Sequence, residues 1–353
     1  MPGGLIPPEG SHGNGKSRPT GDEMKRGGFK ILIQWGLGLL LILLLFFFGD
    51  VSHLVRLPDV RWNAVLMVFL CNVGFTLAHN FRWKEIVDNL PGQERSDFFS
   101  LYRCLIDSYA IGKIIPMDVS LLGLRSYYLK RQKVPVSMAV FSVLLDRFLD
   151  LLLFLVMAVP SFFVITGVAT TIQSVLILLF LLAIQGVVIA WKKGETVHFL
   201  LYLYRRFLVR WLLKIPFLRT RLGGADEAGE GVHFHLGSVI QIMGWNYIKY
   251  IFLCLRFFFT GVALGIQFPL AKSFFFIPFV QLSGLINITP GGLGVVEMGT
   301  YGALYLMGVP NAQIILFVVG QRVLLFSIFL SLFVLTHLFY FIQSRWRRFG
   351  GIG

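Results

Sequence analysis

A glycine-rich break inside a long apolar run constrains the fold of this chain more than any other feature. Between Ser273 and Gln321 the one charged residue is Glu297, and the segment leading into it reads Asn287-Ile-Thr-Pro-Gly-Gly-Leu-Gly-Val-Val-Glu297. Proline ends helices because it lacks an N–H group and clashes with the preceding turn, and glycine adopts backbone angles that other residues avoid. We therefore predict two short helices joined by a polar turn, the second beginning near Leu293.

The composition is that of a polytopic membrane protein. Of the 353 residues, 56% are hydrophobic and 14% are charged, and the mean hydropathy is +0.74. Crossing about 30 Å of hydrocarbon takes roughly 20 apolar residues. We predict an all-α integral membrane protein with two broken re-entrant hairpins and about six full spans, at residues 31–48, 62–81, 136–163, 171–191, 239–266 and 312–342. The formal charge of +14 fits topology signals and contacts with anionic lipid, so we do not expect nucleic acid as a partner.

Glu297 is the candidate functional acid of this membrane domain. A carboxylate at membrane depth costs several kcal/mol, so it is rare, faces inward and has a cationic partner. Non-helical backbone survives at that depth only where it is packed in protein or lines a wet cavity, and the N–H groups that open the second half-helix are suited to an anion. The alternative is a kinked helix with close glycine packing, in which a neighbouring helix satisfies Glu297.

A second broken segment lies in the first half of the chain. Residues 98–129 are apolar in general character but carry several charges, and Pro116 stands in their middle. Such a segment is too charged for helices that face lipid, so we predict a hairpin shielded by neighbouring spans.

The two broken segments belong to an internal repeat. Twelve residues after Pro135 comes Arg147, and twelve residues after Pro310 comes Arg322, an offset of 175 residues in both cases. In the predicted topology the first hairpin opens to the cytoplasm and the second to the outside, so the repeat is inverted, as in many alternating-access transporters. The repeat halves are about 98–163 and 273–342.

The candidate site combines these breaks with the embedded charges. At about 1.5 Å per residue, Arg147 and Arg322 fall near the bilayer midplane. Glu297 is the candidate to balance one of them, which leaves the other arginine for a phosphate. The residues that we assign to substrate binding and translocation are Asn287, Pro290, Gly291, Gly292, Gly294, Glu297, Arg322, Arg147, Asp146, Asp150, Pro116 and Arg125. The alternative is that all these charges are internal salt bridges that fix helix packing. We expect no metal site and no cofactor.

The distribution of basic residues sets the predicted orientation. Most of the 32 lysines and arginines fall on one face of the predicted topology, including Arg82 in the loop after the second span. The positive-inside rule then places both termini in the cytoplasm, and we expect the bacterial cytoplasmic membrane. The predicted parts are a disordered tail at 1–28, a membrane domain at 29–343 with an amphipathic basic loop at 192–232, and a basic tail at 344–353.

The motif Pro290-Gly-Gly-Leu-Gly-Val-Val-Glu297, with Gly308-Val-Pro310 after it, resembles the lysylphosphatidylglycerol synthase transmembrane-domain family, also called the flippase-like domain family. The resemblance covers roughly residues 30 to 340, and a looser likeness includes Arg125 and Asp146-Arg147. The chain departs from the expected glycine-rich turn at Met117-Asp118. The resemblance implies lipid translocation, of aminoacylated phospholipid or of polyprenyl-linked sugars. We do not expect lysyl transfer, because the soluble aminoacyl-transferase domain of bifunctional members has no counterpart here.

The function that we favour is therefore the flipping of an anionic phospholipid or a polyprenyl-phosphate-linked lipid across the membrane. One alternative is an integral-membrane transferase that acts on a lipid phosphate, with Asp146 or Glu297 as general base. Another is a membrane scaffold that does not transport and presents the basic loop to a partner. Assembly into a homo-oligomer is compatible with each.

Overall fold

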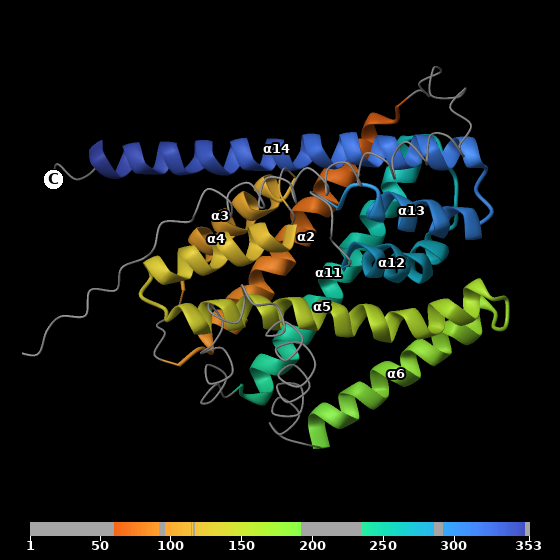
Figure 1. Cartoon of the computed structure of the whole chain (residues 1–353), viewed down its shortest axis with the longest axis horizontal. Coiled ribbons are helices and arrows are strands. Elements are labelled where there is room, and N and C mark those ends of the chain that lie inside the picture. The colour runs from red at the N-terminus through yellow and green to blue at the C-terminus, as the bar shows by residue number, and fades with distance from the viewer. Residues whose placement is uncertain are drawn as a thin grey trace, which may run out of the picture.

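A computed structural model describes residues 60–91, 96–113, 115, 117–191, 234–285 and 292–349. In these ranges the regular structure is helical and contains no strand, which confirms the all-α prediction (Figure 1). The helices are α2 (Trp62–Asp88), α3 (Phe98–Ile111), α4 (Met117–Arg131), α5 (Val136–Ile165), α6 (Thr171–Trp191), α11 (Leu236–Ala263), α12 (Leu270–Leu285), α13 (Val295–Leu306) and α14 (Asn311–Phe349).

Three of the described helices are long and apolar enough to cross a membrane, namely α2, α5 and the part of α14 up to Gln343. Their outer faces carry large exposed apolar side chains, such as Phe162 and Phe326, which is the surface expected of helices that contact lipid. The total of six spans stays a prediction, and the first of them, at residues 31–48, lies outside the described residues.

Both broken segments form a pair of helices. α3 and α4 precede α5, and α12 and α13 precede α14, so the order predicted for the repeat is present. In Figure 1 α5 runs from left to right and α14 from right to left, with the α3/α4 pair toward the left of the molecule and the α12/α13 pair toward the right. This antiparallel placement agrees with an inverted repeat. The depth of either pair in a membrane stays a prediction.

Local sequence explains where these helices begin. Pro135 is the residue before α5, and its ring restricts the backbone angle φ where the chain enters the helix. Asp97 caps α3, because its side chain accepts the amide of Ser100 at 2.8 Å. α2 packs along α11, and the contact is close because Gly74 lies against the ring of Phe252. These two helices form the centre against which the repeat halves pack, and they carry two buried basic residues, Arg82 and Lys249.

Candidate functional site

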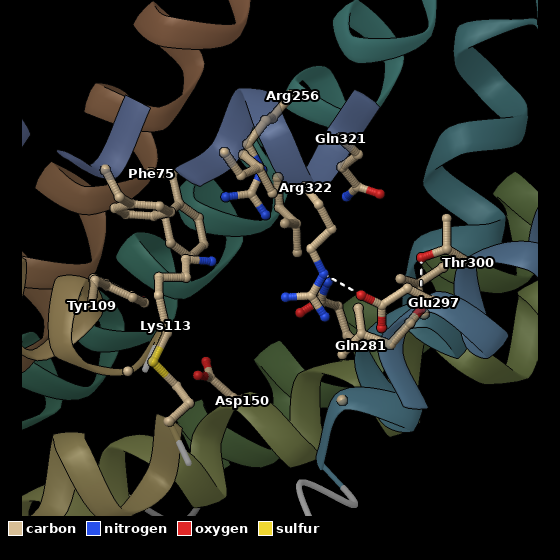
Figure 2. Close-up of a pocket in the computed structure, with 18 of the residues that line it drawn as sticks. Phe75, Tyr109, Lys113, Asp150, Arg256, Gln281, Glu297, Thr300, Gln321 and Arg322 are labelled. Atoms are coloured by element: carbon tan, nitrogen blue, oxygen red, sulfur yellow. Dashed lines mark hydrogen bonds and ion pairs between the residues drawn. The ribbon is translucent and has the colours of Figure 1, made fainter. Parts of the chain in front are cut away.

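A cavity of about 200 Å³ lies where the two repeat halves meet α2 and α11 (Figure 2). Its walls include five basic side chains and two acidic ones, which gives the lining a formal excess of three positive charges. The basic residues are Lys113, Arg147, Lys249, Arg256 and Arg322, and the acidic residues are Asp150 and Glu297. The cavity is therefore strongly cationic although the chain around it is mostly apolar.

Glu297 connects the start of α13 to α14. One carboxylate oxygen accepts the Nε hydrogen of Arg322, and the other accepts the amide of Gly294 at 2.8 Å. Arg322 also donates from Nη2 to the carbonyl oxygen of Gly292 at 3.1 Å. Glu297 is 5% exposed, so the pair forms part of the cavity wall. Of the two partners that the sequence left open for Glu297, the structure selects Arg322.

The glycines of the break make this arrangement possible. Gly292 has a φ of 68° and Gly294 a φ of 83°, both in the left-handed region that L side chains rarely adopt. Gly294 is the N-cap of α13, and its amide donates to the Glu297 side chain three residues later. The second half-helix begins at Val295, close to the predicted start near Leu293.

Arg256 and Lys113 reach the same cavity from two other elements. Arg256 donates from Nη1 to Oδ1 of Asn72 at 3.0 Å and lies over the ring of Phe75 at 5.0 Å. The Nζ of Lys113, just beyond α3, lies 5.0 Å from the ring centroid of Phe329. Figure 2 shows both side chains approaching the space that Arg322 faces. The ring of Phe75 and the amide of Asn72 therefore contact Arg256, and the ring of Phe329 contacts Lys113. An anion that enters the cavity would approach both cations.

Behind this cavity lies a buried polar network centred on Asp146. Its Oδ1 accepts from Nε of Arg82 at 2.8 Å, and its Oδ2 accepts from Nη1 of Arg125 at 2.9 Å. The same Oδ2 lies 2.7 Å from Nε2 of His79, and the Arg125 guanidinium stacks 4.3 Å from the Trp83 ring centroid. All these polar side chains are almost completely buried. The network ties α2, α4 and α5 together.

Asp150 joins the network to the cavity. It accepts hydrogen bonds from Arg82 and from Lys249, and Arg147 lies within 3.8 Å of its second oxygen. Arg82 also donates to Asn246 of α11. Asp150 and Lys249 thus belong both to the network and to the cavity wall.

The matched region of the chain contains both the cavity and the network. Residues 32–347 match the family described as lysylphosphatidylglycerol synthase TM region. The chain belongs to this family. The likeness inferred from the Pro-Gly-Gly-Leu-Gly-Val-Val-Glu motif is thereby confirmed.

Two curated membrane proteins from archaea are similar to this family member. A UPF0104 membrane protein from Methanothermobacter thermautotrophicus is 24% identical over 315 residues, which cover 82% of this chain and 86% of that protein. A UPF0104 membrane protein from Methanocaldococcus jannaschii is 24% identical over 248 residues, which cover 66% of this chain and 71% of that protein. No solved structure matches the chain.

In this member of the lysylphosphatidylglycerol synthase TM family, the structure brings together part of the predicted site. Arg147, Asp150, Glu297 and Arg322 line one cavity. Gly294 donates its amide to Glu297, and the Gly292 carbonyl accepts from Arg322. Asp146 and Arg125 lie in the network behind the wall instead, where they are 0% exposed. Four assigned residues, Asn287, Pro290, Gly291 and Pro116, lie outside the described residues, as does the basic loop at 192–232.

Sequence reasoning placed one basic residue wrongly. Arg82 was assigned to a cytoplasmic loop after a span ending at residue 81, but α2 continues to Asp88 and Arg82 is 0% exposed inside the protein. The prediction failed because Asp146 and Asp150 balance its charge, so an arginine at the end of an apolar run need not mark the membrane surface.

Other cavity and network residues were not assigned to the site at all. His79 precedes Arg82 by three residues, and Lys249 precedes Arg256 by seven, spacings that put each pair on one face of its helix. Lys113, Lys249 and Arg256 were likewise not among the assigned residues. Helical spacing of polar residues within apolar spans is the signal that would have grouped them.

Proposed function

We propose that this protein flips an anionic phospholipid or a lipid-linked headgroup across the cytoplasmic membrane, with both termini on the cytoplasmic side. The observation that carries the proposal is the excess of three positive charges on the walls of one cavity between the two repeat halves. Buried cations in an apolar protein are unfavourable unless they are balanced, and a ligand phosphate supplies the balance. The lipid tails would stay in the bilayer, against the exposed apolar faces of the helices.

The ion pair between Glu297 and Arg322 gives the proposal a mechanism. In the described state Arg322 is held by Glu297 and by the Gly292 carbonyl. A phosphate that enters the cavity competes with Glu297 for the same guanidinium, and arginine binds phosphate and carboxylate oxygens with the same geometry. This ion pair links the start of α13 to α14. If phosphate binding breaks the pair, α13 and α14 would favour a different position relative to each other. A ligand shifts such an equilibrium only through its different affinity for the two states.

Translocation is compatible with membership of this family and needs no transferase reaction. We propose that this chain transports lipid and does not catalyse group transfer to or from a lipid phosphate. The two acids that line the cavity each hold cationic partners, Asp150 with Lys249 and Glu297 with Arg322. Carboxylates held in this way bind and position charge better than they abstract protons.

The test is reconstitution of the purified chain in liposomes that contain a fluorescent anionic lipid in both leaflets. A membrane-impermeant quencher added outside should quench beyond the outer-leaflet fraction when the protein is present. Empty liposomes and liposomes with heat-unfolded protein are the controls. Quenching that stays at the outer-leaflet fraction for every anionic lipid tested, with the protein shown to be folded, would refute the proposal.

A further inference from the structure

The charged residues on the cavity wall fall into two groups. This grouping indicates how the negative charges of a bound lipid headgroup are arranged, in addition to its net charge. The first group, here called the Arg256 cluster, contains Lys113, Arg256, Arg322 and Glu297. The second, here called the Asp150 cluster, contains Arg147, Lys249 and Asp150. Arg322 pairs with Glu297 in the first cluster, whereas Lys249 and Arg147 face Asp150 in the second. Figure 2 shows Asp150 across the open space from Arg256 and Arg322.

Each cluster has more basic than acidic side chains. The Arg256 cluster has three cations and one carboxylate, and the Asp150 cluster has two cations and one carboxylate. The groups directly behind the wall do not cancel this excess, because Arg82 and Arg125 there face the single carboxylate of Asp146. Two neighbouring cationic zones within one small cavity fit a ligand with two neighbouring negative groups.

The same lining is poorly suited to an aminoacylated phospholipid. The lysyl ester of phosphatidylglycerol carries two ammonium groups and one phosphate, so its headgroup has a net positive charge. Its two ammonium groups would compete with the wall's own cations for two carboxylates, Glu297 and Asp150. Bringing a headgroup with a net positive charge into a cavity that already has a positive excess adds repulsion.

We infer that the ligand of this cavity is a diphosphate-linked lipid whose headgroup carries two adjacent phosphates, with one phosphate at the Arg256 cluster and the other at the Asp150 cluster. The inference rests on the proposed function and names its substrate class. The two clusters bind the diphosphate group itself. The prenyl tail is what distinguishes a lipid ligand from free diphosphate.

The experiment compares four fluorescent lipids in liposomes with the intact protein: a prenyl diphosphate, a prenyl monophosphate, phosphatidylglycerol and lysylphosphatidylglycerol. We expect the diphosphate lipid to move at least about tenfold faster than phosphatidylglycerol. Its headgroup carries at least one charge more, and one charge near several cations at an effective dielectric of about 20 is worth more than a factor of ten. Lysylphosphatidylglycerol should move most slowly. Equal rates for the monophosphate, the diphosphate and phosphatidylglycerol would overturn the inference and leave the proposed function standing. The fastest movement for the lysyl lipid would overturn it as well. If none of the four lipids moves, the proposed function fails with it.

Two variants link the preference to the clusters. Arg256→Gln removes a cation, and Gln321→Glu adds a carboxylate to the cavity wall without removing a packed side chain. Both should reduce the rate ratio of diphosphate lipid to phosphatidylglycerol by about tenfold, whereas Arg131→Gln, at an exposed position near the end of α4, should leave the ratio unchanged. Gln321→Glu keeps the test decisive if Arg256→Gln does not fold. An unchanged ratio in a folded Gln321→Glu protein would overturn the assignment.

Thermal stability with inorganic pyrophosphate identifies the source of the diphosphate. Binding to the folded state raises the midpoint of unfolding in proportion to the logarithm of ligand concentration. Stabilisation by pyrophosphate, together with movement of the diphosphate lipid, supports a lipid ligand. Stabilisation by pyrophosphate while the diphosphate lipid stays immobile would overturn the lipid assignment in favour of a soluble diphosphate.

Discussion

Arg322 on α14 donates its Nε hydrogen to one carboxylate oxygen of Glu297, which lies in the first turn of α13. The other oxygen of Glu297 accepts the amide of Gly294. A single carboxylate therefore caps the start of α13 and also neutralises a cation that faces the cavity. The Arg322 side chain is 29% exposed and that of Glu297 5%, so the arginine is the partner that an entering anion reaches.

Replacing Glu297 with glutamine should separate transport from stability. The amide keeps the shape and can still accept from Gly294, but the charge that balances Arg322 is lost. Because Arg322 faces the cavity, we expect a cost of about 1 to 3 kcal/mol, below that of a fully buried pair, and a loss of lipid movement by at least about tenfold. Liposome quenching and thermal stability of the same preparation measure the two effects.

The matched control for this variant is the double replacement Glu297→Gln with Arg322→Gln. Removing both charges should recover part of the stability, because no unbalanced cation remains. It should not recover movement. Wild-type rates in the folded Glu297→Gln protein would exclude Glu297 from the mechanism.

Asp146→Asn should act on folding and not on transport specifically. Asp146 balances two fully buried arginines, so its loss removes the carboxylate that pairs with Arg125 and leaves Arg82 with Asp150, which should cost about 3 to 5 kcal/mol. Asp107→Asn is the control, since Asp107 is partly exposed, lies 3.9 Å from Arg103, and should cost about 1 kcal/mol or less. Thermal unfolding of both proteins in detergent is the measurement, and equal stabilities would contradict the assigned role of Asp146.

Two glycines of α13 should respond in opposite ways to alanine. A Cβ atom at Gly299 would lie 2.0 Å from Oγ of Ser283 on α12, whereas nothing lies within 4 Å of the same atom at Gly302. Gly299→Ala should therefore destabilise the protein by about 1 to 3 kcal/mol. Gly302→Ala should stabilise it by about 0.5 to 1 kcal/mol through helix propensity. If Gly299→Ala is as stable as Gly302→Ala, the two helices do not pack as described.

Cysteine labelling tests the proposed orientation. Arg347→Cys near the end of α14 and Lys193→Cys in the basic loop should react with an impermeant maleimide only from the cytoplasmic side, and Leu306→Cys should react from the outside. Background from native thiols should be low, since Cys71, Cys104 and Cys254 are buried. External reaction at position 193 or 347 would rule out the proposed topology.

Much of the helical architecture was within reach of the sequence. The apolar runs gave α6 its observed bounds, and they gave α5 and the start of α14 to within two residues, because burial in lipid or protein leaves few alternatives to a helix for a long apolar segment. α14 continues to Phe349, seven residues past the predicted end of the span. Pro135 and the glycines around Gly294 predicted where α5 and α13 begin, since their backbone restrictions are local. Glu297 could be identified from the sequence because it is the one acid in a long uncharged run.

The sequence by itself therefore determined the helices, the breaks and the family, because these depend on residues that are neighbours along the chain. Only the tertiary structure decided which charges meet. It paired Glu297 with Arg322 and placed Asp146 with Arg82 behind the cavity wall. It also brought together around one space Lys113, just beyond α3, and cations from α5, α11 and α14. Pairing between side chains far apart in sequence depends on how helices pack and on the electrostatic cost of leaving any buried charge unbalanced, and neither quantity is encoded in a local pattern.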